Sequence, residues 1–567
     1  MLALLAALAA SLPSQFDTPN PADAATRDNP ANRPNILFAF ADDWGRYASA
    51  YVAVDPGGLS DVIATPHFDR VAASGVLLPN AFVSAPSCTP CRSSLLSGRH
   101  FWQTGRGSIL LGAVWDGSIP SYPLLMEKSG YHIGHTYKTW APGKPETHPY
   151  GGRRTQYQPA GAKFSRFSQF VSEAADDDGI ADRKATLLTE ARANFVACLD
   201  DAERAGKPFC YWFGPTNVHR TWTPGSGKRL WGIVPDDLKG KVPPFLPDSP
   251  TVRQDLADYL GEATAFDAGL GELLAELDDR GLTENTLVVV SGDHGAPGFP
   301  NGKCNLYDFG TNVPLAACWP AKIPAGRVVT DFVSLPQLAP TFLEAGGVDR
   351  PDGMSAASLL PTLTSTADGR VDPQANVVFH GRERHVDSAQ FDFAPYPMRA
   401  IRTDDWLLIR NFRPDRYPMG VGPAMGLPDS SDPLPAQVWN DFTFAGYADL
   451  DASPTKAEIV ALRNLPSVQP YFRIAFDRRP EFELYSVTSD PHQVTNLAGR
   501  PETAAVQAEL TERLMTTLRE TGDPRLVDDG AFYEAGEMAA ESESGRRSRA
   551  RTAEQVQKAY GRELTLP

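Results

Sequence analysis

The chain has 567 residues, of which 42% are hydrophobic and 22% are charged, an ordinary balance for a globular protein. This length exceeds what one small core can hold, so we expect two domains or one large domain with an appendage. The net charge of −16 argues against nucleic acid and anionic membranes as general partners, and an anionic substrate would need a locally basic pocket.

The first ten residues are typical of the apolar part of a secretory signal peptide, and a leader rich in Pro, Asn and Asp follows. We therefore predict a signal peptide and leader over residues 1–25 and a secreted or periplasmic location. A short buried helix is the alternative, because the positively charged start of a signal peptide is missing. No later run is long enough to cross a bilayer, so no stable membrane insertion is expected. Six cysteines in 567 residues are too few for a disulfide scaffold.

Two neighbouring acids follow the first predicted strand. Residues 35–41 form a continuous apolar run, which predicts a strand buried on both faces in a parallel sheet. Asp42 and Asp43 come directly after it, at the edge where open α/β sheets bind their ligands. Two adjacent carboxylates repel each other, so a cation between them is a natural explanation. A solvated turn with a helix cap is the alternative.

A cysteine loop entering a helix is predicted over residues 87–99, after a helix and a strand within residues 66–83. Pro90 suits the first helical turn and Gly98 can end the helix. Cys88 then lies near unpaired backbone N–H groups, a place that favours anions and lowers the pKa of a thiol. Arg92 adds a fixed positive charge. A structural disulfide or buried thiols, and a redox site of the form Cys88-x-x-Cys91, are the alternatives.

Further polar residues follow predicted strands along the chain. Lys138 lies in the segment 130–140, and His219 follows an apolar run at 208–214. Residues 252–280 have the apolar periodicity of a core helix. The β-branched run at 287–291 predicts another buried strand, and Asp293 and His294 follow it directly. Lys303 then lies in a glycine-rich loop.

The segment Cys88-x-Pro90-x-Arg92, followed by Gly98, resembles the signature of type I sulfatases. In that family the cysteine is oxidised to formylglycine, whose hydrate attacks sulfur, and a formylglycine-generating or sulfatase-maturating enzyme is the partner that performs the oxidation. The resemblance assigns a Ca²⁺ site, with Mg²⁺ as second choice, to Asp42, Asp43, Asp293, His294 and the modified Cys88. It assigns catalytic roles to Cys88, Arg92, Lys138, His219 and Lys303. Trp140 departs from the pattern, because it stands where the family has a histidine.

Segments after residue 300 resemble sulfamidases, the sulfatases that act on N-sulfoglucosamine. These segments are Cys304-Asn305-Leu306-Tyr307 and Tyr396-Pro397-Met398-Arg399. The resemblance implies a sulfated saccharide as substrate, most like N-sulfoglucosamine of heparan type. We predict that the polar cluster after a strand at 377–380 lines the substrate pocket with one later arginine; these residues are Arg382, Glu383, Arg384, His385 and Arg399. A solvated charge run is the alternative.

The resemblance implies an α/β fold like alkaline phosphatase, with a mostly parallel sheet between helices and a smaller α+β domain with an antiparallel sheet. We expect a catalytic domain over residues 33–375, the smaller domain over 376–535 and a polar tail over 536–567 that is exposed or partly helical. An O-sulfatase on another polysaccharide and a phosphomonoester or phosphonate hydrolase are the alternative enzymes. If Cys88 is never modified, a non-catalytic sulfoglycan-binding protein is the alternative.

Overall fold

The structure of the chain is a computed structural model that describes residues 33–422, 434–562 and 564. The predicted signal peptide and leader lie outside the described residues. Among the described helices, none combines the length and the apolar character that a membrane span requires.

Seven strands form the central sheet in the order β10-β2-β9-β8-β1-β7-β5. They are β1 (Asn35–Ala41), β2 (Val76–Leu77), β5 (His132–Tyr137), β7 (Phe209–Gly214), β8 (Thr286–Gly292), β9 (Leu315–Cys318) and β10 (Arg327–Val328). The middle of the sheet is parallel, because β1 pairs in parallel with β7 and β8, and β5 with β7. Only β9 among these strands runs antiparallel to its neighbours. The predicted mostly parallel sheet is therefore confirmed.

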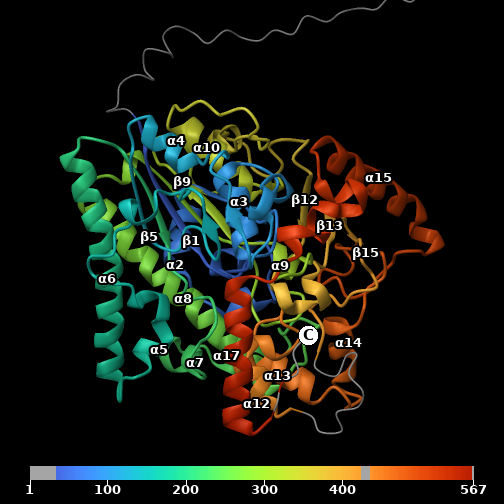
Figure 1. Cartoon of the computed structure of the whole chain (residues 1–567). Helices are drawn as coiled ribbons and strands as arrows, with labels where there is room; N and C mark the ends of the chain where they lie inside the picture. The colour runs from blue at the N-terminus through green and yellow to red at the C-terminus, as the bar shows by residue number, and fades with distance from the viewer. Residues whose placement is uncertain (1–32, 423–433, 563, 565–567) are drawn as a thin grey trace, which may run out of the picture.

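The strand β1 is apolar throughout because helices cover both of its faces. Leu37, Ala39 and Ala41 pack into one core with α2 (Pro66–Ala73), α6 (Asp177–Arg204) and α8 (Pro250–Asp279). Ile36, Phe38 and Phe40 pack into the other with α3 (Cys88–Ser97), α4 (Tyr122–Lys128) and α10 (Leu338–Ala345). Figure 1 shows α6 and α8 on one side of the sheet and α4 and α10 on the other. Each large apolar side chain buried here contributes about 1.5–3 kcal/mol.

The long helix α8 carries the apolar stripe that the sequence predicts for residues 252–280. Its start is fixed by Ser249, whose hydroxyl accepts a hydrogen bond from the N–H of Val252, and by Pro250 in the first turn. Leu256, Leu260 and the other periodic leucines are buried in the first core.

A second, antiparallel sheet is built by the later part of the chain. Its strands, in order, are β12 (Val377–Arg382), β13 (Met398–Thr403), β14 (Trp406–Asn411) and β15 (Phe482–Ser486). The helix α15 (Ala504–Glu520) packs one face of this sheet through Leu510, Leu514 and Leu518. Figure 1 shows this orange and red region beside the central sheet. The expected small antiparallel sheet is confirmed, and the domain boundaries at residues 375 and 535 stay predictions.

The remaining elements are short, apart from one helix near the end of the chain. Two small parallel pairs join β3 (Ala81–Phe82) to β11 (Val333–Ser334) and β4 (Val114–Trp115) to β6 (Lys144–Pro145). The short helices are α5 (Phe167–Val171), α7 (Ser226–Trp231), α9 (Asp308–Thr311), α11 (Leu360–Thr364), α12 (Ala436–Asp441), α13 (Pro454–Ala461), α14 (Gln469–Phe476) and α16 (Ala531–Glu534).

The predicted polar tail contains α17 (Glu543–Tyr560), so part of it is helical as expected. Its inner face is packed rather than exposed, because Val556 is fully buried in an apolar cluster with residues of α12 and α13. The N–H of Ser542 also donates to Asp387 at 2.6 Å. These contacts tie the helix to the body of the protein.

Candidate active site

The Asp42-Asp43 pair and the Asp293-His294 pair predicted from the sequence meet at the carboxyl edge of the central sheet. Ala41 pairs with Gly292, so the ends of β1 and β8 lie side by side. The N–H of Asp43 donates to Oδ1 of Asp293 at 2.7 Å. Asp43 itself has a φ of 62°, an uncommon conformation for a residue with a side chain. The tight turn after β1 therefore aims both carboxylates at the loop after β8.

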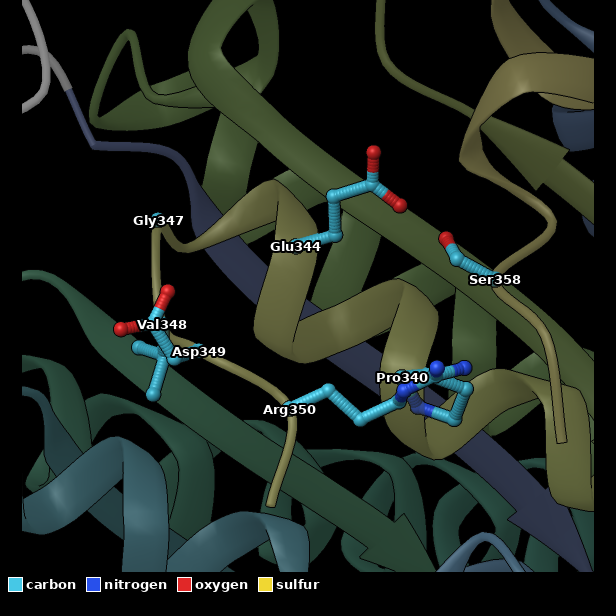
Figure 2. A pocket seen from close by; sticks show the side chains of 7 residues that line it. All are labelled: Pro340, Glu344, Gly347, Val348, Asp349, Arg350 and Ser358. Atoms are coloured by element: carbon cyan, nitrogen blue, oxygen red, sulfur yellow. The ribbon is translucent and has the colours of Figure 1, made fainter. Parts of the chain in front are cut away.

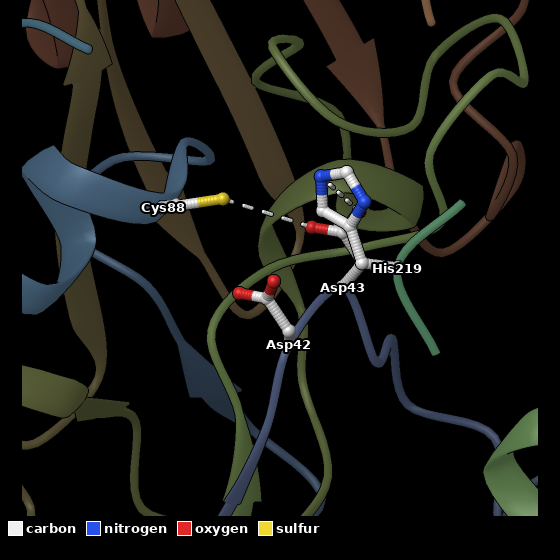
Figure 3. A group of neighbouring side chains, drawn as sticks. All are labelled: Asp42, Asp43, Cys88 and His219. Atoms are coloured by element: carbon white, nitrogen blue, oxygen red, sulfur yellow. Dashed lines mark hydrogen bonds and ion pairs between the residues drawn. The ribbon is translucent and has the colours of Figure 1, made fainter. Parts of the chain in front are cut away.

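Cys88 is the first residue of α3, and its side chain points toward this acidic edge. Its sulfur lies 3.4 Å from Nε2 of His294 and 3.9 Å from Oδ1 of Asp43. The helix ends at Gly98 with a φ of 63°, as the sequence predicts. All six cysteines are free, so the disulfide alternative for Cys88 and Cys91 has no support in the structure. Figure 3 shows Cys88 facing the two acids that follow β1.

Arg92 joins the helix to one acid after each of the two strands. Its guanidinium donates to Oδ2 of Asp293 at 2.9 Å and to Oδ1 of Asp42 at 2.9 Å. A third nitrogen donates to the backbone carbonyls of Lys138 and Thr139. The side chain is fully buried, and these internal partners occupy its donors. Arg92 therefore fixes the positions of the acids around Cys88 and adds a positive charge beneath them.

Two lysines and a histidine approach the same acids from other loops. The Lys138 ammonium lies 2.7 Å from Oδ1 of Asp42, and the Lys303 ammonium lies 3.1 Å from Oδ2 of Asp43. Nδ1 of His219 lies 2.6 Å from the carbonyl of Arg220, which can only accept, so Nδ1 carries the proton of that bond. This leaves Nε2 of His219 facing Lys303 at 3.3 Å. The His219 side chain is 34% exposed, so it reaches both the buried acids and the solvent.

Burial and charge act in opposite directions on the two carboxylic acids that hold Arg92. Burial alone would raise the pKa of Asp42, but the Lys138 ammonium and the Arg92 guanidinium together hold that pKa well below its usual range. The pKa of Asp293 is raised, chiefly by burial. The Lys138 ammonium keeps its proton, because Asp42 raises its pKa against the effect of burial.

The pKa of the Cys88 thiol differs from the sequence expectation. Its place at a helix N-terminus predicts a lowered pKa, but burial raises it well above the ordinary value, and the Asp42 carboxylate raises it further. Burial, together with the neighbouring carboxylate, outweighs the effect of the helix N-terminus on this pKa. Cys88 is thus a neutral thiol at pH 7, which is an unfavourable form for a redox dithiol or a thiolate nucleophile.

The donor set at this edge fits a hard divalent cation. Ligand atoms of Asp42, Asp43, Cys88 and His219 lie within 4.8 Å of one another, and those of Cys88, Asp293 and His294 do the same. Oδ1 of Asp43 and Nε2 of His294 are 3.1 Å apart. Three buried carboxylates with one or two imidazoles form an oxygen-rich set, which favours Ca²⁺ or Mg²⁺ over Zn²⁺.

Two acids near the site have no signal in the sequence. Asp451 lies in the loop before α13, and its Oδ2 is 3.5 Å from the Lys303 ammonium. That lysine, followed by His219, keeps the pKa of Asp451 low although burial would raise it. Asp255 on α8 makes a two-pronged ion pair with Arg220, at 2.8 and 2.9 Å, beside His219. The Asp451 segment has no apolar period, and Asp255 is hidden within a core helix, so no pattern marks either residue.

The cluster predicted to contact substrate is largely engaged within the protein. Arg399 is fully buried and bonds to Glu383 at 2.7 Å and to Asp523 at 2.5 Å. Arg382 pairs with Asp449. Arg384 donates to the carbonyls of Leu111 and Ala540 at 2.8 and 2.9 Å. These internal partners argue against a role in substrate contact for Arg382, Glu383, Arg384 and Arg399, because a substrate would have to displace them.

His385 is the one member of that cluster that contacts the cysteine loop. Its Nδ1 lies 2.8 Å from the hydroxyl of Ser87, the residue before Cys88. Burial lowers the pKa of His385 well below its ordinary value, so the ring is neutral at pH 7. His132 and His135, in contrast, bond to Tyr157 and to the carbonyl of Gly152 and have structural contacts.

The cavity above the acids is lined by Asp42, Lys138 and His219 and has a volume of about 480 Å³. Another pocket, of about 240 Å³, is lined by residues around the end of α10, including Glu344, Asp349 and Arg350, as Figure 2 shows. Gly346, which precedes the pocket residue Gly347, lies close to the hydroxyl of Tyr131. That hydroxyl donates to the carbonyl of Pro34, just before β1. This pocket therefore lies at the amino ends of the strands, the edge opposite to the acids.

Comparison with known proteins decides the family. Residues 34–348 match the family described as Sulfatase, which is more than half of the chain. The chain belongs to the sulfatase family. Residues 296–418 also match the family described as N-sulphoglucosamine sulphohydrolase, C-terminal. The resemblance stated from the cysteine segment is confirmed, and the protein is a hydrolase.

Individual relatives differ in what they act on. The human N-sulphoglucosamine sulphohydrolase is 28% identical over 534 residues, covering 88% of this chain and 93% of the relative. An ulvan-active sulfatase of Formosa agariphila is 25% identical over 533 residues, covering 88% and 77%. A solved structure in complex with D-glucosamine-2-N,6-O-disulfate has a TM-score of 0.55 at 18% identity, covering 87% of this chain and 98% of the other, and it supports the fold.

Proposed function

We propose that this sulfatase releases sulfate from N-sulfoglucosamine in a glycan of heparan type. The observation that carries the reaction is the position of Cys88, 3.4 Å from His294 and 3.9 Å from Asp43, next to Asp42, which lines a cavity together with Lys138 and His219. The match of residues 296–418 to the sulphohydrolase family and the similarity to the human enzyme support the N-sulfated substrate. The similarity to an ulvan-active sulfatase makes O-sulfate hydrolysis the alternative.

The reaction requires positive charges that offset the negative charge of the sulfate group. A sulfate group repels nucleophiles, so positive charges placed around it lower the barrier. Asp42, Asp43, Asp293, His294 and the modified Cys88 would hold the divalent cation, Ca²⁺ or else Mg²⁺, which supplies such a charge when bound. Lys138 and Lys303 supply two more: Lys138 lines the cavity beside Asp42, and the buried Lys303 pairs with Asp43.

Formylglycine at position 88 would supply a hydrated aldehyde, the nucleophile that this family uses. Arg92 keeps Asp42 and Asp293 oriented on either side of that position. Nε2 of His219 faces the cavity and can hold the proton that a leaving amine or alcohol needs. Asp293 is a carboxylate beside Cys88 that can accept a proton there.

The burial of Cys88 bears on how it would be modified. Its side chain is 2% exposed at the start of a helix in the folded protein. An enzyme cannot reach a side chain that is buried in the folded protein, so we propose that the maturating enzyme acts before residues 87–99 fold. Secretion or export to the periplasm would then follow or accompany the modification.

Sulfate release tests this proposal. The protein, produced with a formylglycine-generating enzyme, is incubated with glucosamine N-sulfate, glucosamine 6-O-sulfate and an aryl phosphate, and free sulfate or phosphate is measured. We expect sulfate from the N-sulfated sugar, with none from a Cys88→Ala variant. Faster release from the 6-O-sulfate would favour the O-sulfatase, and faster phosphate release would favour the phosphohydrolase. Binding of the sulfated sugar without any release would indicate the non-catalytic alternative.

A further inference from the structure

A groove leads sideways from the catalytic cavity. A second cavity, of about 460 Å³, adjoins the cavity of about 480 Å³ that contains Asp42 and His219. The two have Lys138, Ala141, Ser165 and Thr216 in common, so their walls are continuous. Each cavity lies in the size range of small-ligand sites. The groove therefore has room for more than the sugar that would carry the reacting sulfate.

The groove is basic although the protein as a whole is acidic. Among the residues that line the two cavities, Asp42 is the one acid, and Arg92 and Lys138 already neutralise it. Arg220 is likewise neutralised by Asp255. The remaining fixed charges are the guanidinium groups of two arginines, one in each cavity. A local excess of positive charge in a chain of net charge −16 concentrates anions at that place.

These two arginines, Arg153 and Arg166, have exposed side chains. Within the described part of the chain, neither side chain has a hydrogen-bond or ion-pair partner. Nearby cations in the same loops are engaged elsewhere. Arg154 bonds to Glu127 at 2.8 Å, and the Lys163 ammonium lies over the ring of Phe170 at 5.1 Å. The unpaired positive charge of these loops is therefore directed to the groove.

The rest of the second cavity has polar groups that suit the hydroxyls of a sugar. Its aromatic residues, Tyr137, Trp140 and Tyr150, are buried, so they contribute little to the exposed wall. Gln156 and Gln158 contribute amides, which can both donate to and accept from hydroxyl groups. Amides beside exposed guanidinium groups suit a ligand that carries both hydroxyls and an anionic group.

We propose that this groove binds the sugar next to the one that carries the reacting sulfate, and that Arg153 and Arg166 contact an anionic group on that neighbouring sugar. The position of the reacting sugar rests on the proposed function. Guanidinium groups bind sulfate and carboxylate groups through paired hydrogen bonds, so either group would serve. The substrate is then an acidic oligosaccharide of two or more units rather than a single sugar.

Binding without turnover tests the groove. In a Cys88→Ala background, the affinity for a heparin-derived tetrasaccharide and for glucosamine N-sulfate is measured by titration calorimetry. We expect the double variant Arg153→Gln, Arg166→Gln to bind the tetrasaccharide about 10-fold or more weakly, equivalent to about 1.4 kcal/mol. Its affinity for the monosaccharide should change less than about twofold. The matched control, Arg154→Gln with Lys163→Gln, removes the same charge outside the groove and should leave both affinities unchanged.

Two results would overturn the inference. One is an unchanged tetrasaccharide affinity in the Arg153→Gln, Arg166→Gln protein. The other is an equal loss of affinity for the tetrasaccharide and for the monosaccharide, which would place the two arginines at the reacting sugar or in a general electrostatic role. Because both residues are exposed, the variants should keep the thermal midpoint of the parent. Absence of sulfate release by the unmutated protein would refute the proposed function, whereas the affinity comparison would still decide the groove.

Discussion

The sulfur of Cys88 lies 3.4 Å from Nε2 of His294, although 206 residues separate them in the chain. This contact joins the start of α3 to the end of β8, and Oδ1 of Asp43 lies 3.1 Å from the same nitrogen. The residue that the family modifies is therefore next to the proposed metal ligands. Arg92, one helical turn after Cys88, bonds to acids from both strand ends and holds this arrangement in place.

Cys88 and Cys91 should respond differently to substitution. Cys88→Ala removes the precursor of the nucleophile, so turnover should fall by about 10³-fold or more. Cys91 packs in the second core and touches no part of the cavity, so Cys91→Ala should cost about 1 kcal/mol of stability and keep most of the turnover. Sulfate release and thermal unfolding of both variants give the comparison. Equal and total loss of turnover in two folded variants would favour a dithiol mechanism.

Metal content should depend on the acids at the strand ends. Asp42→Asn, Asp43→Asn and Asp293→Asn each remove a charged oxygen ligand, so the affinity for the divalent ion should fall by about 10- to 100-fold. Asp451→Asn is the control, since this acid pairs with Lys303 outside the two ligand clusters and should leave metal content unchanged. Elemental analysis of the purified proteins measures this, and full occupancy in all three strand-end variants would remove the proposed site.

Glu383 should matter for stability rather than for substrate affinity. It is buried between Arg399 and Arg525, and Glu383→Gln removes the carboxylate charge that both buried guanidinium groups share. The free energy of unfolding should fall by about 3 kcal/mol, with KM for the sulfated sugar unchanged. Glu481→Gln, which loosens an exposed pair with Arg410, should cost less than about 1 kcal/mol. An increased KM in a Glu383→Gln protein of normal stability would restore the substrate role predicted from the sequence.

Asp267 should contribute stability that is fully present below about pH 4 and is lost as the pH rises to about 7. This buried acid accepts hydrogen bonds from the N–H groups of His67 and Phe68, and burial raises its pKa to about 7. The folded state therefore holds a proton that the unfolded state releases, so unfolding becomes easier as the pH rises through that interval. Thermal midpoints of Asp267→Asn should vary less with pH than those of the unmutated protein. Glu284→Gln, at an exposed position, should leave the slope unchanged, and an equal slope in all three proteins would contradict the assignment.

Much of the fold and part of the site follow from local sequence patterns. The runs at 35–41, 208–214 and 287–291 are apolar without alternation, which is the pattern of strands covered on both faces, and the structure places them together in the central sheet. Parallel strands have their carboxyl ends at the same edge of the sheet, so the residues after β1 and β8 are expected to lie close together there. Glycine and proline marked the ends of the cysteine helix.

Other features depend on partners far away in the chain. Arg399 resembles a substrate-binding residue in sequence, but its partner Asp523 comes 124 residues later and buries it in the core. Asp451 comes close to Lys303 only through tertiary folding. The helix position of Cys88 predicts a lowered pKa for its thiol, whereas burial among acids from two other elements raises it. Local patterns cannot reveal such long-range burial and pairing.

The most direct test of the account is a mass spectrum of the tryptic peptide over residues 71–92, taken from a preparation that releases sulfate. This peptide contains both Cys88 and Cys91. We predict an aldehyde at Cys88, seen as a mass below that of the thiol form and as reaction with a hydrazide probe, and a free thiol at Cys91. An active preparation with an unmodified Cys88 thiol, or with a disulfide between Cys88 and Cys91, would contradict the formylglycine mechanism.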